Sequence, residues 1–352
     1  MNTKTKTVTS STDNQRFMRR WIFILISILT LSACHSGGQK DDALSDVDIK
    51  VIRYDRLQYE AFALNSFSAL QKMSTECPQA TKLLIERVLD IGRAKDTDIN
   101  ERLCAYYSDS ILQRIMEDAT LVKFKDMKDI EKGLTEGFRK LKKELPDLVI
   151  PQVYSQVSAL NQSVVVGDSL LGFSIDKYMG ADYPLYKRYY YNYQLRVMNP
   201  DCIVPDCLMS YLYSQYPFPW EEGNRTLFDI MIYHGKVAWV MDKILNYDTE
   251  SGKLLNYTAK ETEWCQKNIS SIWKWMKERN HLSSTDPMLI RAYTHPDPSV
   301  IFGGKKVPPF LGTWMGVQLV DAYMSQHKEV TVQQLLQRKD CHTLLQEMDF
   351  NP

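Results

Sequence analysis

Apolar residues recur at every third or fourth position through most of the chain, and this spacing predicts amphipathic helices with one buried face. The first begins with Pro78 and ends at Gly92, residue types that favour the start and the end of a helix. Thr258 with Glu261 has the spacing of a capping box, a pattern that recurs at the start of the last helix. The expected helices cover residues 78–92, 108–119, 129–143, 225–245, 258–278, 313–326 and 331–348.

The middle of the chain departs from this helical spacing, which predicts strands. Val153 and Val157 indicate an extended segment, and residues 164–175 are expected to form a β-hairpin with a glycine in its turn. Helices, a small antiparallel sheet and further helices together indicate an α+β fold that is mostly α-helical. No linker divides the later part of the chain, so we expect residues 49–352 to form a single globular domain.

The N-terminus has the pattern of a bacterial export signal. Three arginines precede an apolar run over residues 21–31, which is too short to span a bilayer comfortably as a permanent helix. The run ends in Leu31-Ser32-Ala33-Cys34, which matches a lipobox: an aliphatic residue and two small residues before a cysteine. We therefore expect residues 1–33 to be removed and the Cys34 thiol to carry a lipid, with further acylation making the anchor stable. An ordinary signal peptide with a coincidental cysteine, or a plain membrane anchor, is the alternative.

The segment after the signal is small, polar and acidic, so residues 34–48 are expected to be a flexible tether between the membrane and the domain. The whole chain has 43 basic and 43 acidic residues, of which five basic and one acidic lie in residues 1–33, leaving 38 and 42. The mature chain is therefore mildly acidic. It has no basic field for nucleic acid, and no nucleic-acid-binding motif accompanies it.

The chemistry-bearing residues do not complete a known catalytic motif. Zinc peptidases of one large class place H-E-x-x-H on a helix, with two histidine ligands and a glutamate that activates water. Here His234 begins the corresponding segment, but Gly235 stands where the glutamate would be and Ala238 where the second histidine would be. The remaining histidines have no ligand spacing, and no nucleophile elbow, P-loop or dinucleotide fingerprint is present. We therefore expect no catalytic residues, cofactor or metal, and His234 to be exposed or satisfied in the core.

Six cysteines follow Cys34, and an exported protein can form disulfides. Cys202 and Cys207 are the best candidate pair, because Pro205 between them favours a short loop; buried free thiols are the alternative for the rest. The sequence contains no C-x-x-C pair, so we expect neither a zinc ribbon nor a thioredoxin-like redox site.

A second unusual segment is rich in tyrosine. Tyrosine supplies stiff, amphipathic contact area, which suits a surface that binds protein, glycan or lipid, and a packed aromatic layer is the alternative. The seven tyrosines of this segment are Tyr178, Tyr183, Tyr186, Tyr189, Tyr190, Tyr191 and Tyr193.

Several segments together resemble one family, the gliding-motility lipoprotein GldB. Besides the lipobox and tether, the similar segments lie along essentially the whole mature chain, and their order and spacing are more specific than any one of them. They are Ile52-Arg-Tyr-Asp55, residues 175–182, Met231 to Lys236, Tyr257 through Trp264 with Ile272-Trp273, and Phe310 to Met324.

The resemblance implies an envelope lipoprotein grouped with the gliding apparatus and its type IX secretion system, with envelope or secretion proteins as partners. It implies no catalytic activity and no cofactor. The family is itself distantly similar to predicted zinc-dependent peptidases, whose H-E-x-x-H would fall near His234 to Ala238, so a peptidase-like fold with a lost site is a further expectation. The alternative function is a metal-dependent hydrolase of peptides or envelope polymers with an atypical site.

Overall fold

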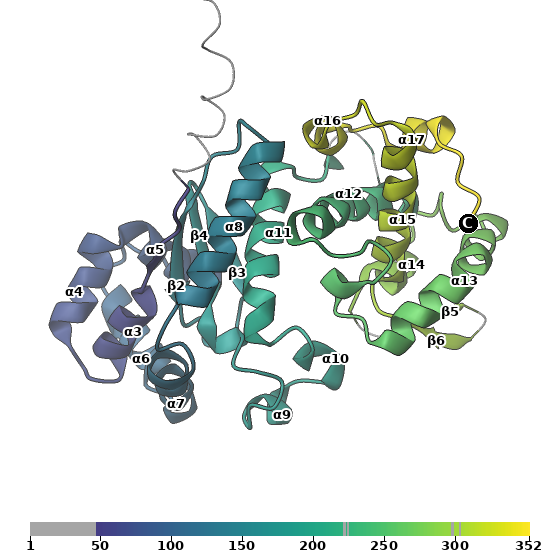
Figure 1. Ribbon diagram of the computed structural model, residues 1–352. Helices are drawn as coiled ribbons and strands as arrows, with labels where there is room; N and C mark the ends of the chain where they lie inside the picture. Colours follow the sequence, from purple (N-terminus) through teal and green to yellow (C-terminus); the bar gives the residue numbers. More distant parts are fainter. Residues whose placement is uncertain (1–46, 221–222, 224, 297–298, 303) are drawn as a thin grey trace, which may run out of the picture. The chain divides into compact units, whose positions relative to one another are not determined.

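A four-stranded sheet lies in the N-terminal half of the molecule, with helices on both faces (Figure 1). The computed structural model describes residues 47–352 except 221–222, 224, 297–298 and 303. Residues 48–352 form one compact unit. The lipobox, Cys34 and the expected signal and tether up to residue 46 lie outside the described residues.

The order of the strands is β1-β2-β4-β3. Strand β2 is parallel to both of its neighbours, with Val51 opposite Val153 and Val153 opposite Leu171, whereas β3 and β4 are antiparallel. The strands are β1 (Val51–Ile52), β2 (Gln152–Gln156), β3 (Val164–Gly167) and β4 (Leu170–Ser174).

The expected hairpin is confirmed as β3 and β4, but the expected glycine is not in its turn: Gly167 pairs with Leu170 as the last residue of β3, and Asp168 and Ser169 make the turn, with Ser169 at φ 55°. The sheet is nevertheless mixed, so the expectation of a purely antiparallel sheet was wrong. The reason is non-local: residues 51–52 add a short parallel strand, and hydrophobic spacing cannot show which distant strands will pair.

The N-terminal helices pack on the sheet. Helix α3 contacts β2, and α5 contacts the β3–β4 hairpin. Helix α11 also contacts the hairpin, and it packs against α8. Glycine allows close packing between the last two, because a Cβ at Gly137 would overlap with the Leu208 side chain. These elements are α3 (Tyr54–Phe62), α4 (Phe67–Glu76), α5 (Pro78–Leu83), the π-helix η1 (Leu84–Val88), α6 (Ile99–Tyr107), α7 (Ser110–Glu117), the π-helix η2 (Asp118–Lys123), α8 (Lys128–Glu144) and α11 (Ile203–Gln215).

The C-terminal half is built around α12 and α15, which lie side by side (Figure 1). Both expected capping boxes form, at Thr258 and at Thr331. The other elements are η3 (Ile175–Lys177), α9 (Tyr186–Tyr189), α10 (Asn192–Leu195), η4 (Pro200–Cys202), α12 (Leu227–Leu245), η6 (Lys253–Leu255), α13 (Ala259–Glu278), α14 (Pro287–Thr294), β5 (Ser299–Phe302), β6 (Lys305–Val307), α15 (Leu311–Gln326), α16 (Val332–Gln337) and α17 (Cys341–Glu347).

The last expected helix, over residues 331–348, is instead two helices. Arg338 leaves the helical conformation, with ψ 117°, and the Asp340 side chain then caps the N-terminus of α17. The break shapes a cleft beside α12, because residues 336–339 and Cys341 form part of its wall.

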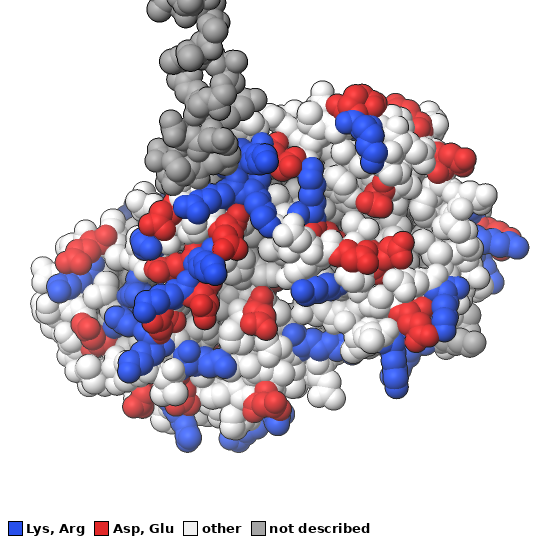
Figure 2. Space-filling view, in the orientation of Figure 1, with Lys and Arg blue, Asp and Glu red and all other residues white. Residues whose placement is uncertain are grey.

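The class expected from the sequence, a mostly helical α+β fold, is confirmed. Among the described helices, none combines the length and the apolar character that a membrane crossing requires. On the face shown in Figure 2, acidic and basic side chains are interspersed over most of the surface.

Candidate functional site

Helix α12 carries the residues around which the candidate site is built. Its start is fixed by a capping box, in which the Thr226 side chain accepts a hydrogen bond from the backbone N–H of Asp229 and the Asp229 carboxylate accepts one in return. The helix is apolar on most sides and largely buried, so its few charged residues stand out. Those residues lie on two different sides of the helix, and the two sides have different surroundings.

One side of α12 is closed by α15. A Cβ atom at Gly235 would overlap with the backbone of Gly316, and a Cβ at Gly316 would overlap with the carbonyl oxygen of Met231. The two backbones therefore touch at this crossing, and only glycine fits on either side. Gly235 holds the position of the glutamate in the H-E-x-x-H comparison, so the space that a catalytic side chain would need is occupied by α15.

The His234 side chain has a hydrogen-bond partner within the core, which is one of the two possibilities expected from the sequence. Its Nδ1 lies 2.9 Å from the hydroxyl of Tyr213, and the rings of Tyr213 and Tyr233 pack beside it. Burial lowers the pKa of His234 to about 4, because the charged imidazolium would lose its hydration. The ring is therefore neutral at physiological pH. Ala238, the position of the second histidine, is buried as well.

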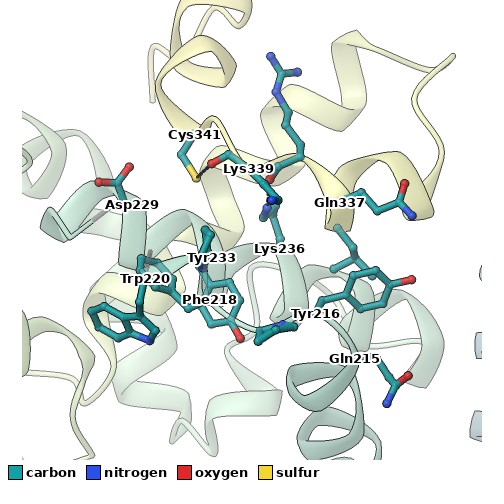
Figure 3. A pocket seen from close by; sticks show the side chains of 14 residues that line it. Gln215, Tyr216, Phe218, Trp220, Asp229, Tyr233, Lys236, Gln337, Lys339 and Cys341 are labelled. Atoms are coloured by element: carbon teal, nitrogen blue, oxygen red, sulfur yellow. Dashed lines mark hydrogen bonds between the residues drawn. The ribbon is translucent and has the colours of Figure 1, made fainter. Parts of the chain in front are cut away.

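The other side of α12 opens into a cleft of about 650 Å³ (Figure 3). Asp229, Tyr233 and Lys236 line it from positions i, i+4 and i+7 of the helix, a spacing that puts them on one face. The segment after α11, residues 215–220, forms a second wall, and the α16–α17 connection forms a third. The cleft is thus assembled from three parts of the chain.

Aromatic rings line the middle of this cleft. The ring of Phe218 lies 4.5 Å from that of Trp220 and 5.1 Å from that of Tyr233, measured between centroids. Figure 3 shows Phe218 and Tyr233 between Asp229 and Lys236. Trp220 is 55% exposed, so part of its indole surface is open to a ligand. Such a surface offers apolar contact at low entropic cost.

Lys236 forms the cationic end of the cleft. Only 5% of the residue is exposed, and its Nζ donates a hydrogen bond of 2.5 Å to the backbone carbonyl oxygen of Arg338. Burial lowers the pKa of Lys236. The Arg338 guanidinium is itself bound by Tyr323, Thr343 and Glu347.

Asp229 forms the acidic end. Its Oδ2 accepts hydrogen bonds from the backbone N–H and the hydroxyl of Thr226, while its Oδ1 makes no hydrogen bond and lies 3.4 Å from Nε2 of His342. Nearby, burial raises the pKa of the Cys341 thiol to about 11, so the thiol is protonated and a poor nucleophile at neutral pH. This arrangement can bind a ligand, and it lacks an activated nucleophile.

The expected disulfide between Cys202 and Cys207 does not form, and both are free, buried thiols. Pro205 does not open a loop, because α11 begins at Ile203 and takes up the intervening residues. Helical geometry then directs the two cysteine side chains away from each other. The other cysteines of the described chain are also free.

The tyrosine-rich segment is mainly a packed layer rather than an open surface. Tyr178 and Tyr186 are fully buried, Tyr183 donates a hydrogen bond to Asp118, and Tyr190 contacts Lys177. Burial is also the main cause of the raised pKa of these four tyrosines. Two tyrosines of the segment, Tyr189 and Tyr191, are exposed to solvent.

No motif in the sequence predicts the cleft. A signal was present, since Asp229 and Lys236 are charged residues within a helix that is apolar around most of its circumference. The cleft's other walls lie far away in the sequence, and no pattern connects them to α12. Within the described residues, no group of three or more histidine, cysteine, aspartate or glutamate side chains is arranged to hold a metal ion.

By its fold the protein is a mostly helical α+β domain with a partly enclosed cleft on its central helix. The family model described as gliding motility protein GldB matches residues 37–352, and the chain belongs to this family. By family it is a gliding-motility lipoprotein, a class of cell-envelope protein. No curated protein and no solved structure matches the chain.

Two of the segments that carry the family resemblance, Met231 to Lys236 and Phe310 to Met324, meet in the structure. They lie on α12 and α15, and they contain Gly235 and Gly316. The resemblance therefore includes the residues that make the close helix crossing.

Proposed function

We propose that this chain is a noncatalytic, lipid-anchored component of the gliding and type IX secretion machinery that binds a partner through the cleft on α12. The anchor is the acylated Cys34, reached through the tether of residues 34–48, and the domain works in the envelope while fixed to a membrane. The support for the anchor is the lipobox Leu31-Ser32-Ala33-Cys34 together with the family.

The observation that carries the noncatalytic part is the contact between Gly235 and Gly316. A water-activating glutamate at this helix position would need space that the backbone of α15 fills. His234 is neutral and bonded to Tyr213, so it is already committed within the core. Polar groups of α12 also line the cleft on its other side, and they suit binding.

The test is complementation of a gene deletion in the native host. The deletion is expected to impair gliding or type IX secretion, and the wild-type gene and His234→Gln are expected to restore it. Cys34→Ser is expected to restore neither membrane attachment nor function, and labelled fatty acid should appear on the wild-type protein but not on Cys34→Ser. Unchanged gliding, secretion and envelope integrity in the deletion strain would contradict the proposal.

The alternative of a metal-dependent hydrolase is decided by metal analysis of the purified protein. We expect no stoichiometric zinc. Zinc bound at one equivalent and lost in His234→Ala would overturn the noncatalytic assignment.

A further inference from the structure

The charge balance within the cleft is uneven. Lys236 is a buried ammonium group whose one hydrogen-bond acceptor among the described residues is the backbone carbonyl of Arg338. An ammonium group has three N–H donors, so this single bond leaves donors available toward the cleft. Burying a charge without a counter-ion is costly, so an anion that entered the cleft and paired with Lys236 would offset a desolvation cost that the fold already carries.

No acidic side chain of the described cleft is placed to neutralise Lys236. Asp229 lies seven residues earlier on α12, so the two backbone positions are about 10 Å apart along the helix axis, and the ion pair of Asp229 is with His342 and not with Lys236. Its carboxylate is held by Thr226 and faces His342. The Cys341 thiol is protonated, so it supplies no negative charge.

The chemistry of this end of the cleft favours a carboxylate over a phosphate. A phosphate is typically held by a cluster of arginines, and the guanidinium of Arg338 is already bound by Tyr323, Thr343 and Glu347. The remaining donors of Lys236 match the oxygens of one carboxylate, and the exposed Lys339, which also lines the cleft, adds positive charge at this end. Beside them stand the rings of Tyr233 and Phe218, which suit a large apolar side chain on the same ligand.

Resting on the proposed binding role, we infer that the cleft recognises the carboxy terminus of a partner protein whose last residue is aromatic. The terminal carboxylate pairs with Lys236, and the terminal side chain packs against Phe218, Trp220 and Tyr233. The preceding residues extend along the cleft, whose volume of about 650 Å³ exceeds that of a single residue. Capture of a terminal carboxylate is a recurring mode of peptide recognition.

The experiment uses the full chain, purified in detergent, and two matched peptides, acetyl-Gly-Gly-Phe as the free acid and as the amide. Calorimetry is expected to show that the acid binds at least about tenfold more tightly than the amide, because only the acid carries the charge that Lys236 can pair. Free phenylalanine is a third arm, and weaker binding by it than by the peptide separates a peptide site from an amino-acid site.

Lys236→Gln is expected to remove the preference for the acid. Lys243→Gln is the matched control, since Lys243 lies on the same helix, outside the cleft, and pairs with Glu144. Equal affinity for acid and amide in the wild-type protein would overturn the inference even if Lys236→Gln failed to fold. No peptide binding up to millimolar concentration would overturn it as well.

The two proposals fail in different ways. If Lys236→Gln restores gliding or secretion to the deletion strain and the peptides do not bind, the cleft inference is wrong and the role in the machinery stands. If the deletion strain is unaffected but the acid peptide still binds through Lys236, the role in the machinery is wrong and the site stands.

Discussion

The two sides of α12 differ in what their residues do. On one side Gly235 meets the backbone of α15, and Asp242, two turns further along, is also buried. On the other side Asp229, Tyr233 and Lys236 line a cleft that is open to solvent. The comparison with zinc peptidases draws attention to the first side, and the structure assigns that side to packing. Similar motif positions can therefore serve the fold while the accessible chemistry lies elsewhere on the same helix.

The largest effect is expected when a glutamate is placed at position 235, on the closed side of α12. Gly235→Glu is expected to destabilise the fold by more than about 4 kcal/mol, because the side chain would overlap with Gly316 and bury an unpaired charge. Thermal and chemical denaturation followed by circular dichroism measure this. Lys243→Glu, at a partly exposed position of the same helix, should cost less than about 1 kcal/mol. A stable Gly235→Glu protein would show that the crossing leaves room for a side chain.

The next largest effect concerns Asp242, on the closed side. Burial, with Asp248 and Asp321 nearby, raises its pKa to about 7, and its Oδ1 has no hydrogen-bond partner. The folded protein thus holds this proton more tightly than the unfolded chain, and the resulting stability is lost as the pH rises from the ordinary value of 3.8 through about 7.

Asp242→Asn is therefore expected to stabilise the protein at about pH 8 by up to about 3 kcal/mol and to have little effect at about pH 4. Urea denaturation at a series of pH values measures the difference. Asp182→Asn is the control, because this side chain is fully exposed and should give a difference that is flat with pH. A flat difference for Asp242→Asn would mean that the carboxylate is not buried as described.

His234 should give a pH dependence of the opposite sign. Its folded pKa of about 4 is below the ordinary value of 6.5, so the folded state resists protonation and stability falls as the pH drops through this range. His234→Gln is expected to cost about 1 kcal/mol at about pH 7. By about pH 4 the difference should have moved by about 2 kcal/mol in favour of His234→Gln, so that the variant becomes the more stable protein.

Tyr213→Phe is the control for this prediction. It removes the hydrogen bond to Nδ1 but keeps the buried ring, so the acid sensitivity should remain. Titration of His234 by NMR in the wild-type protein near the ordinary value of 6.5 would contradict the buried placement.

The smallest effect on stability is expected at the open side. Trp220 is 55% exposed, and Trp220→Ala should change the free energy of unfolding by less than about 0.5 kcal/mol. Its affinity for acetyl-Gly-Gly-Phe should nevertheless fall severalfold, because the ring packs beside Phe218 in the cleft. Met288→Ala removes an exposed apolar residue outside the cleft and should change neither quantity. Unaltered peptide binding by Trp220→Ala would exclude this ring from the site.

Local patterns explain where the expectations from sequence succeeded. The helix starts at Thr258 and Thr331 depend on side chains three residues away, and the β3–β4 hairpin depends on a tight turn. Such contacts are encoded within a few residues, so spacing and residue type suffice. Where local signals were weak the expectations failed: α3 and α4 were not foreseen, and the last helix was drawn through its break at Arg338.

Residue types and their spacing were enough to predict the mostly helical α+β class, the family and the absence of an intact H-E-x-x-H motif. Three features became visible only in the folded chain: β1 pairs with β2, Gly235 lies against Gly316, and residues near 218, 233 and 338 enclose one cleft. The physical reason is distance along the chain. Each of these contacts depends on how separate elements pack, and packing follows from the shapes of surfaces that no single segment contains.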